Sequence, residues 1–198
     1  GHHTNPPDLS SVTYKTVHMR EVGEGKDFRM IFFPEQCRHC ELAPCMTAST
    51  VDGAIIQDEE TGAVVFTELT AQLDAKAVRD ACPYDIPRVD PATKILHKCD
   101  FCNDRVHEGM LPACVLSCPT GCMNFGEREE MEELAETRLK ELKERFPNAS
   151  LGDNGTVHVI YLYAEDPNLY HKYAVFAQND ADPLTRRQLF AKLRRPVA

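Results

Sequence analysis

The sequence predicts an α+β protein with two cysteine-rich lobes, an inserted β-hairpin, and a C-terminal helix and tail. Nine cysteines in 198 residues are too many for idle thiols, and most of them gather at residues 37–45 and 99–118, with Cys82 between the two groups. Two short apolar runs flank a polar turn at residues 54–66, which is the pattern of a hairpin. Residues 127–146 carry apolar side chains at a spacing of three to four, which indicates an amphipathic helix.

Residues 1–34 are expected to form an N-terminal arm followed by a strand. Residues 1–11 are polar and rich in turn formers, and they predict an arm that is either loose or ordered by docking. Residues 13–20 alternate weakly between apolar and polar side chains and favour a strand. Residues 28–33 are apolar and β-prone, and Pro34 is expected to end the strand that they form.

Residues 35–96 are expected to form the first lobe, which holds one metal cluster. Its hairpin pairs residues 54–56 with residues 63–66, and the turn between them ends in Gly62, which suits a positive φ. Residues 70–81 place four apolar residues on one face and predict a short helix. Prolines then break the chain into turns.

Residues 97–126 hold the second cysteine group and are expected to form the second lobe. Residues 127–198 follow as a C-terminal helix, a strand and a docking tail. The helix is predicted over residues 127–146, where charged side chains occupy the face opposite the apolar ones. Residues 156–164 are rich in β-branched and aromatic residues and favour a strand. The end of the chain is polar with scattered aromatics, which suits a tail that wraps around a neighbouring protein.

The chain is acidic, because it has 22 Lys and Arg against 31 Asp and Glu and a formal net charge of −9. A negative charge disfavours nucleic-acid binding and favours a basic protein partner. No stretch approaches the roughly 18 apolar residues that indicate a membrane span. No charged and then apolar leader is visible, so the sequence predicts no signal peptide.

The cysteine spacing favours iron–sulfur clusters. Cys37, Cys40 and Cys45 form a CxxC pair with a third cysteine close behind, and the second group repeats a CxxC pair at residues 99–102. Cys82 and the last cysteine of the second group each precede a proline. Three thiolates on one loop and a distant Cys-Pro step are typical of [4Fe-4S] proteins. A tight loop can reach three irons of a cubane, whereas the fourth ligand must come from another direction.

Two other uses of cysteine fit less well. Disulfides would leave one of nine cysteines over and would strain the CxxC pairs. A zinc site made from the CxxC pairs at residues 37–40 and 99–102 would leave four more cysteines and both Cys-Pro steps without a role. That hypothesis describes a zinc-stabilised interaction module. The colour of the protein separates the two, because zinc is colourless and [4Fe-4S] is brown.

Four further residues near the cysteines invite a role. His39 lies between Cys37 and Cys40 and is expected to pack beside the thiolates. Lys98 and Arg105 flank the second group, where they either offset cluster charge or lie on the surface. Cys122 stands apart from the motifs and is expected to be a small buried apolar residue.

The sequence resembles the four-motif ferredoxin-like subunits of molybdenum and tungsten pterin oxidoreductases. Within that family it looks like the β subunits of the soluble formate dehydrogenases of sulfate-reducing bacteria. The resemblance covers nearly the whole chain and implies an α+β fold of two ferredoxin-like [4Fe-4S] lobes. The matching segments are NPPDLSSVTYKTV, FFPEQCRHCELAPC, ETGAVVFTELT, ACPYDIPR, KCDFCNDRVHEGMLPACVLSCPTGCMNFG and LYHKYAVFA.

The resemblance implies which cysteines share a cluster, because the second and third motifs of that family pair with each other. Cys37, Cys40 and Cys45 match the leading cysteines of the second motif, and Cys82 matches the last cysteine of the third. Together they would hold one complete [4Fe-4S] cluster. Its sister cluster is expected to be absent, because non-ligands occupy its positions. These are Ser49, Gln72, Ala75 and Val78.

The fourth motif is complete and consists of Cys99, Cys102, Cys114 and Cys118. In the family it pairs with a first motif, which has no counterpart in these residues. The resemblance implies that the first three of these cysteines share a second cluster with one upstream cysteine, and that Cys118 completes a third cluster with three more. We therefore expect an upstream segment with four cysteines and three clusters in total. Without that segment, the four cysteines would hold a single cluster and the total would be two.

The resemblance also implies the function of an electron-transfer subunit that is not itself catalytic. A large catalytic subunit with a tungsten or molybdenum bis-pterin cofactor would oxidise formate to CO2, or run the reverse reaction. The [4Fe-4S] clusters would relay electrons to an external acceptor, and the acidic surface favours a basic multihaem cytochrome c. The same role in a dimethyl sulfoxide, thiosulfate or nitrite-type system is the alternative.

Relatives of this kind are exported together with their catalytic subunit. A periplasmic location is therefore expected even without a leader, and a cytoplasmic one is the alternative.

Overall fold

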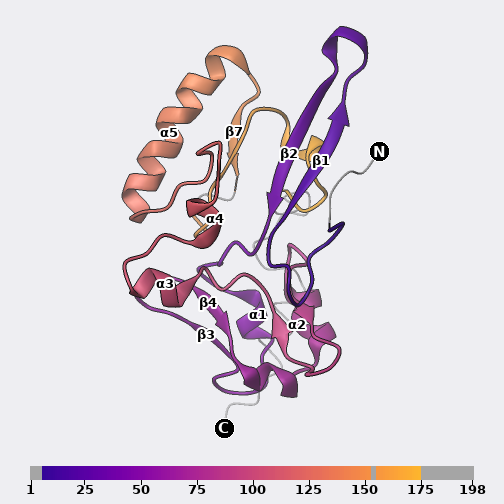
Figure 1. Cartoon of the computed structure of the whole chain (residues 1–198), viewed down its shortest axis with the longest axis vertical. Coiled ribbons are helices and arrows are strands. Elements are labelled where there is room, and N and C mark those ends of the chain that lie inside the picture. Colours follow the sequence, from indigo (N-terminus) through magenta and orange to yellow (C-terminus); the bar gives the residue numbers. More distant parts are fainter. Residues whose placement is uncertain (1–5, 153–154, 175–198) are drawn as a thin grey trace.

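The computed structural model describes residues 6–152 and 155–174, so most of the predicted docking tail lies outside the described residues. Short helices and two-stranded hairpins make up the lower part of the molecule (Figure 1). The hairpin of β1 and β2 and the long helix α5 both extend from this part of the molecule (Figure 1). Each of the four sheets has two antiparallel strands. The fold is therefore mixed, with its long elements outside the cysteine region.

The first hairpin pairs β1 (Thr16–Val22) with β2 (Arg29–Glu35), and a 3-10 turn, η1 (Gly25–Asp27), lies between them. Both predicted strands are present. The prediction that Pro34 ends the second one is wrong, because β2 runs on to Glu35 and Pro34 lies opposite Val17. A two-stranded sheet tolerates proline, since one side of each strand has no ladder partner.

The predicted hairpin of the first lobe is confirmed as β3 (Ile55–Gln57) and β4 (Val64–Phe66). The Asp58 side chain orders the turn by accepting hydrogen bonds from the backbone N–H groups of Glu60 and Thr61. Gly62 has a φ of 69°, and a Cβ at this position would collide with the ring of His158. Glycine is therefore required here by both conformation and space.

The single helix predicted over residues 70–81 is instead two elements. These are the 3-10 helix η2 (Glu68–Gln72) and the α-helix α2 (Ala75–Ala81). Asp74 causes the break, because its carboxylate accepts hydrogen bonds from the backbone N–H groups of Lys76 and Ala77 and caps α2. A residue that caps a helix has extended backbone, so the preceding turn cannot continue into α2.

Five further short elements lie around the cysteine motifs, and two of them contain a cysteine. They are α1 (Pro44–Thr47), β5 (Arg88–Val89), β6 (Leu96–His97), α3 (Asn103–His107) and α4 (Ala113–Leu116).

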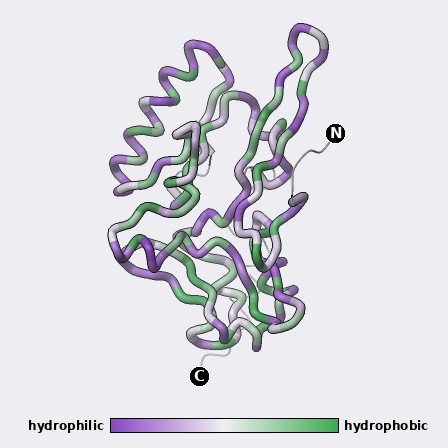
Figure 2. The backbone as a smooth tube through the Cα atoms, viewed as in Figure 1, coloured by the Kyte–Doolittle hydropathy of each residue, from purple (hydrophilic) through white to green (hydrophobic). Residues whose placement is uncertain are grey.

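The predicted C-terminal helix is confirmed as α5 (Arg128–Arg145). None of its residues is fully buried, and hydrophilic residues recur along its turns (Figure 2). No helix among the described residues is long and apolar enough to cross a membrane.

Only part of the strand predicted over residues 156–164 forms. β8 (Tyr161–Tyr163) pairs with β7 (Ser150–Gly152), and the 3-10 helix η3 (Pro167–Leu169) follows. The start of the run lies along the first cysteine loop instead, where Val157 forms a bridge with Cys40. Its hydrogen bonds therefore go to the cysteine loop rather than to a sheet.

In the part of the chain that the structure describes, buried side chains form three small clusters rather than one core. The first is aromatic and lies between β2 and β8, the second surrounds Cys45 and Val78, and the third contains Cys37 and Tyr84. The cysteines of the first group thus belong to the apolar interior. Packing around them is part of what holds the fold together.

Candidate metal centre

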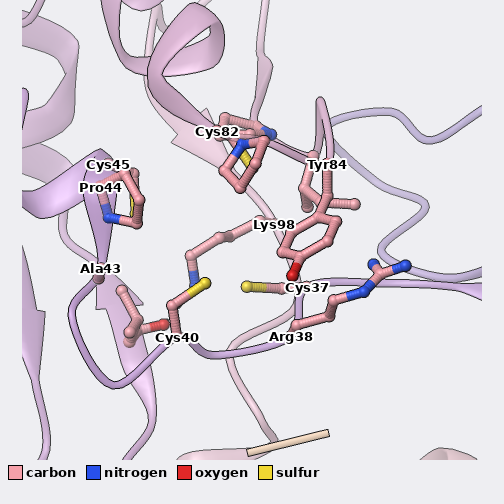
Figure 3. Close-up of a pocket in the computed structure, with 13 residues that line it drawn as sticks. Cys37, Arg38, Cys40, Ala43, Pro44, Cys45, Cys82, Tyr84 and Lys98 are labelled. Atoms are coloured by element: carbon pink, nitrogen blue, oxygen red, sulfur yellow. Dashed lines mark hydrogen bonds between the residues drawn. The ribbon is translucent and has the colours of Figure 1, made fainter. Parts of the chain in front are cut away.

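Four cysteines from two distant parts of the chain line one cavity (Figure 3). Cys37 and Cys40 lie in the loop after β2, Cys45 lies in α1, and Cys82 directly follows α2. Helices α1 and α2 contact each other, which brings the two segments together. The structure therefore places the first predicted ligand set around a single space.

Backbone N–H groups are directed at these sulfur atoms. The amide of His39 donates to Sγ of Cys37 at 3.4 Å, and the amides of Tyr84 and Ile86 donate to the sulfur of Cys82. Such donors stabilise negative charge on sulfur and tune a bound cluster. This arrangement is consistent with the prediction that a tight loop wraps around a cluster.

His39 itself is fully buried and packs as expected from the sequence. Its φ of 49° lies in the left-handed region, which is costly for a residue other than glycine. Two contacts hold it there: Nδ1 accepts a hydrogen bond from the amide of Val64 at 2.9 Å, and the ring packs on Phe101 with 4.5 Å between centroids. His39 thus fixes the turn between Cys37 and Cys40.

Burial makes bare thiolates unfavourable at this site. It raises the pKa of Cys45 far above that of a free thiol, and it raises the pKa of Cys82 to about 11 and that of Cys99 to about 12. Buried thiolates need a positive counter-charge, which metal ions supply when they displace the thiol protons. The chemistry of these residues therefore fits a metal cluster.

Lys98 lies in a different place from the one that its sequence position suggests. It was predicted to flank the second cysteine group, yet its buried side chain lines the cavity of the first group (Figure 3). Its ammonium donates to the carbonyl oxygens of Val64 and Cys99 and lies 4.7 Å from the centre of the Phe66 ring. A fixed positive charge therefore faces the predicted cluster.

Arg38 is a second buried cation that the sequence analysis missed. Its guanidinium lies 3.9 Å from the centre of the Tyr84 ring and donates to the carbonyl oxygen of Tyr173 at 2.7 Å. Its charge also lowers the pKa of Cys82, against the larger effect of burial. The signal was available, because an arginine inside a CxxC loop must lie near the thiolates.

The second cysteine group begins beside the first. Cys99 packs against the apolar cluster that contains Cys37, Cys102 directly precedes α3, and Cys114 lies in α4. Cys118 follows α4, and its pKa falls to about 6, mainly because the Thr120 hydroxyl donates to its sulfur. These residues occupy neighbouring short elements of the second predicted lobe.

Lys15 is another missed cation, and it faces the second group. Its Nζ lies 2.8 Å from Sδ of Met123. Burial lowers the pKa of Lys15, whereas nearby cysteine thiolates, Cys114 first among them, raise it.

Cys122 and Arg105 were the subjects of two further predictions. Cys122 is exposed rather than buried, with Sγ 3.6 Å from Sγ of Cys118, because it lies in an open loop. The Arg105 guanidinium donates to the carbonyl oxygen of Leu111, which corresponds to the surface alternative.

The four positions at which the sister cluster is predicted to lack ligands lie in different surroundings. Val78 is 1% exposed and packs among apolar side chains, and Ala75 packs against the same cluster. The Ser49 hydroxyl donates to the carbonyl oxygen of Val51, and Gln72 is exposed. The absence of the sister cluster stays a prediction.

Comparison with known proteins decides the family. The family of 4Fe-4S dicluster domains matches residues 28–128. The chain is 52% identical over 182 residues to formate dehydrogenase 2 subunit beta (cytochrome c-553) of Nitratidesulfovibrio vulgaris, which covers 89% of this chain and 83% of the relative. The chain belongs to the iron–sulfur subunits of formate dehydrogenase.

Two further members agree. The subunit is 48% identical over 178 residues to formate dehydrogenase subunit beta of Megalodesulfovibrio gigas, covering 88% of this chain and 83% of the relative. It is 37% identical over 177 residues to the formate dehydrogenase-O iron–sulfur subunit of Escherichia coli, covering 86% of this chain and 58% of the relative. The predicted family and the predicted role as an iron–sulfur electron-transfer subunit are thereby confirmed.

Proposed function

We propose that Cys37, Cys40, Cys45 and Cys82 ligate one [4Fe-4S] cluster in this formate dehydrogenase subunit. The observation that carries the proposal is that these four thiols line one cavity, although Cys82 is distant in sequence. A bound cluster supplies a one-electron carrier. The chain supplies the thiolates, directs N–H groups at them, and keeps the cations Lys98 and Arg38 beside them.

The electrons would come from a large partner subunit with a tungsten or molybdenum bis-pterin cofactor. Oxidation of formate to CO2 releases one proton and two electrons, whereas each [4Fe-4S] cluster accepts one electron at a time. A relay of two or more clusters therefore suits the reaction, because together the clusters can hold both electrons. The chain itself is proposed to transfer electrons without catalysing the oxidation.

The second group of cysteines is proposed to serve two further clusters. Cys99, Cys102 and Cys114 need one more thiolate, and Cys118 needs three, if each group completes a cubane. We propose that an upstream segment supplies these four cysteines. The other arrangement, a single cluster on the four cysteines of this group, is distinguished by the iron content.

A c-type cytochrome is the proposed acceptor, and a basic multihaem cytochrome suits the net charge of −9. The relative from N. vulgaris carries cytochrome c-553 in its name, which supports this class of partner. The proposed location is the periplasm, where such cytochromes are found. An acidic subunit and a basic cytochrome should associate more slowly as salt increases.

One experiment tests the function directly. The purified complex is mixed with formate without oxygen, frozen after short intervals, and followed by EPR. We expect the cluster signals to appear before an added c-type cytochrome is reduced. A complex in which the cytochrome is reduced at the same rate after loss of the clusters would contradict the proposal.

A further inference from the structure

Two histidines and one glutamate meet away from the cysteine cavity. Nε2 of His18, in β1, lies 2.5 Å from Oε2 of Glu35, the last residue of β2. Nδ1 of His171, which follows η3, lies 3.8 Å from Oε1 of the same carboxylate. The two imidazole rings stack with 4.3 Å between centroids and 13° between planes. The segment after β8 returns beside the first hairpin, which brings His171 close to the other two residues (Figure 1).

The carboxylate at the centre is buried. Glu35 is 3% exposed, and a buried carboxylate is costly unless cations or hydrogen bonds compensate it. Among the described residues, His18 and His171 are the basic side chains recorded within ion-pair distance of it. The negative charge of Glu35 is therefore compensated either by these two rings or by an ion that they bind.

His171 presents an unprotonated nitrogen to the carboxylate. Its Nδ1 accepts a hydrogen bond from the amide of Tyr173 at 3.3 Å, so this nitrogen carries a lone pair. Burial also lowers the pKa of His171, which favours the neutral ring. Unprotonated Nδ1 forms no ion pair with the carboxylate oxygen 3.8 Å away, whereas a cation bound by both atoms, in place of the hydrogen bond from Tyr173, would make the contact favourable.

We propose that His18, Glu35 and His171 bind one zinc ion. Two neutral imidazoles and one carboxylate are a common ligand set for zinc, with water in the fourth position. The three ligand atoms already lie within 4.8 Å of one another. Tetrahedral bonds of about 2.0–2.1 Å place ligand atoms roughly 3.4 Å apart. Zinc binding therefore requires the two rings to turn out of their parallel stack until a nitrogen lone pair of each faces the ion.

Binding at this site is a simple exchange of ions. Zinc replaces the proton that His18 and Glu35 share, and that proton is released to solvent without any redox change. The Thr16 hydroxyl, 3.3 Å from Nε2 of His18, is placed to hold the bound water.

The ion would connect the C-terminal segment to the first hairpin. That segment is the one whose Tyr173 and Ala174 carbonyl oxygens accept hydrogen bonds from Arg38, and Arg38 adjoins Cys37. Zinc would therefore fix the backbone that holds a buried cation beside the iron–sulfur site. The proposal itself requires only the three ligands and does not depend on the cluster assignment.

The test is metal analysis of the intact complex after dialysis against a weak chelator. We expect one zinc per complex to be lost in the His18→Asn/His171→Asn double variant, with the iron content unchanged. His107→Asn is the matched control, because His107 contacts the half-buried Asp58 and the exposed Glu60 without a second histidine recorded there. Equal zinc in the wild type and the double variant would overturn the proposal.

X-ray absorption at the zinc edge of the wild-type complex provides a test that needs no variant. The zinc at the proposed site should have nitrogen and oxygen ligands and no sulfur ligand. This zinc is identified as the one that is lost in the Glu35→Gln variant. Sulfur in that shell would mean that zinc occupies a cysteine site, and this would also overturn the proposal. The iron count reports separately on the cluster assignment, so failure of one conclusion is distinguishable from failure of the other.

Discussion

The ammonium of Lys98 donates a hydrogen bond of 3.0 Å to the carbonyl oxygen of Cys99, while the same side chain lines the cavity of the first cysteine group. One buried cation therefore touches both groups of predicted ligands. Its charge is held in place by the carbonyl oxygens of Val64 and Cys99 and by the face of Phe66. If the proposed cluster occupies this cavity, the charge of Lys98 would stabilise an added electron there.

Lys98→Met is expected to lower the reduction potential of the first cluster. A unit charge several ångströms away contributes about 2 kcal/mol at an effective dielectric constant of about 20. For a one-electron couple this corresponds to roughly 90 mV. An EPR-monitored redox titration measures the shift. Lys98→Arg keeps the charge and should shift the potential much less, whereas equal potentials in wild type and Lys98→Met at equal iron content would contradict the role.

Cys82→Ala and Cys40→Ala are expected to remove the same cluster. The two residues line one cavity, and each would supply one thiolate to a shared cubane. Both variants should lose the same EPR signal and about four irons per subunit. Cys122→Ala is the matched control, because this exposed cysteine lies outside the proposed ligand set. Loss of two different signals would show that the pairing is wrong.

The native subunit is expected to hold about twelve irons. Four thiolates in the second group supply three ligands to one cubane and one to another, so four more are required from upstream. Intact-mass and iron analysis of the subunit as the organism makes it decide the matter. A mass near 22.3 kDa, which is that of these 198 residues, with about eight irons would mean two clusters.

Val78→Ala is expected to reduce stability without changing the iron content. Val78 is 1% exposed and packs against Ile55, Val64 and Leu96, so its truncation leaves a cavity that costs about 2 kcal/mol. The thermal midpoint of the complex should fall by a few degrees. Val89→Ala makes the same change at a side chain that is 43% exposed and should have little effect. Iron loss in Val78→Ala would instead indicate a cluster near this residue.

The pair of His107 and Asp58 is expected to make stability depend on pH. The hydrogen bond with Asp58 raises the pKa of His107, so this contribution is complete below the unfolded value near 6.5 and disappears as pH rises through the folded pKa. Hydrogen bonds, with that from the Thr61 amide first, lower the pKa of Asp58, so its contribution is lost only in strong acid. Thermal midpoints of wild type and His107→Gln should therefore differ most below about pH 6.5 and converge as the pH rises through the folded pKa.

Both side chains of this pair are partly exposed, so the difference should be small. A constant difference from pH 5 to pH 9 would show that His107 acts through packing alone.

Local signals predicted much of the fold. Three-to-four spacing marked α5, two apolar runs marked the hairpin of β3 and β4, and Gly62 marked its turn. The break between η2 and α2 was also readable, since Asp74 is a strong helix cap. These features depend on neighbours within a few positions, so the sequence alone expresses them.

The family followed from the sequence by itself, and the proposed ligand groups come from the same source, because cysteine spacing reflects the shape of a cubane. Tertiary structure alone decided which charges face the cysteines. Lys98 reaches back to Val64, Arg38 binds the carbonyl of Tyr173, and His171 joins His18 at Glu35. Each contact joins residues far apart in the chain and depends on the packing of short elements around the cysteines. No local spacing encodes such packing, since the free energy that selects it comes from burial of the whole assembly of side chains.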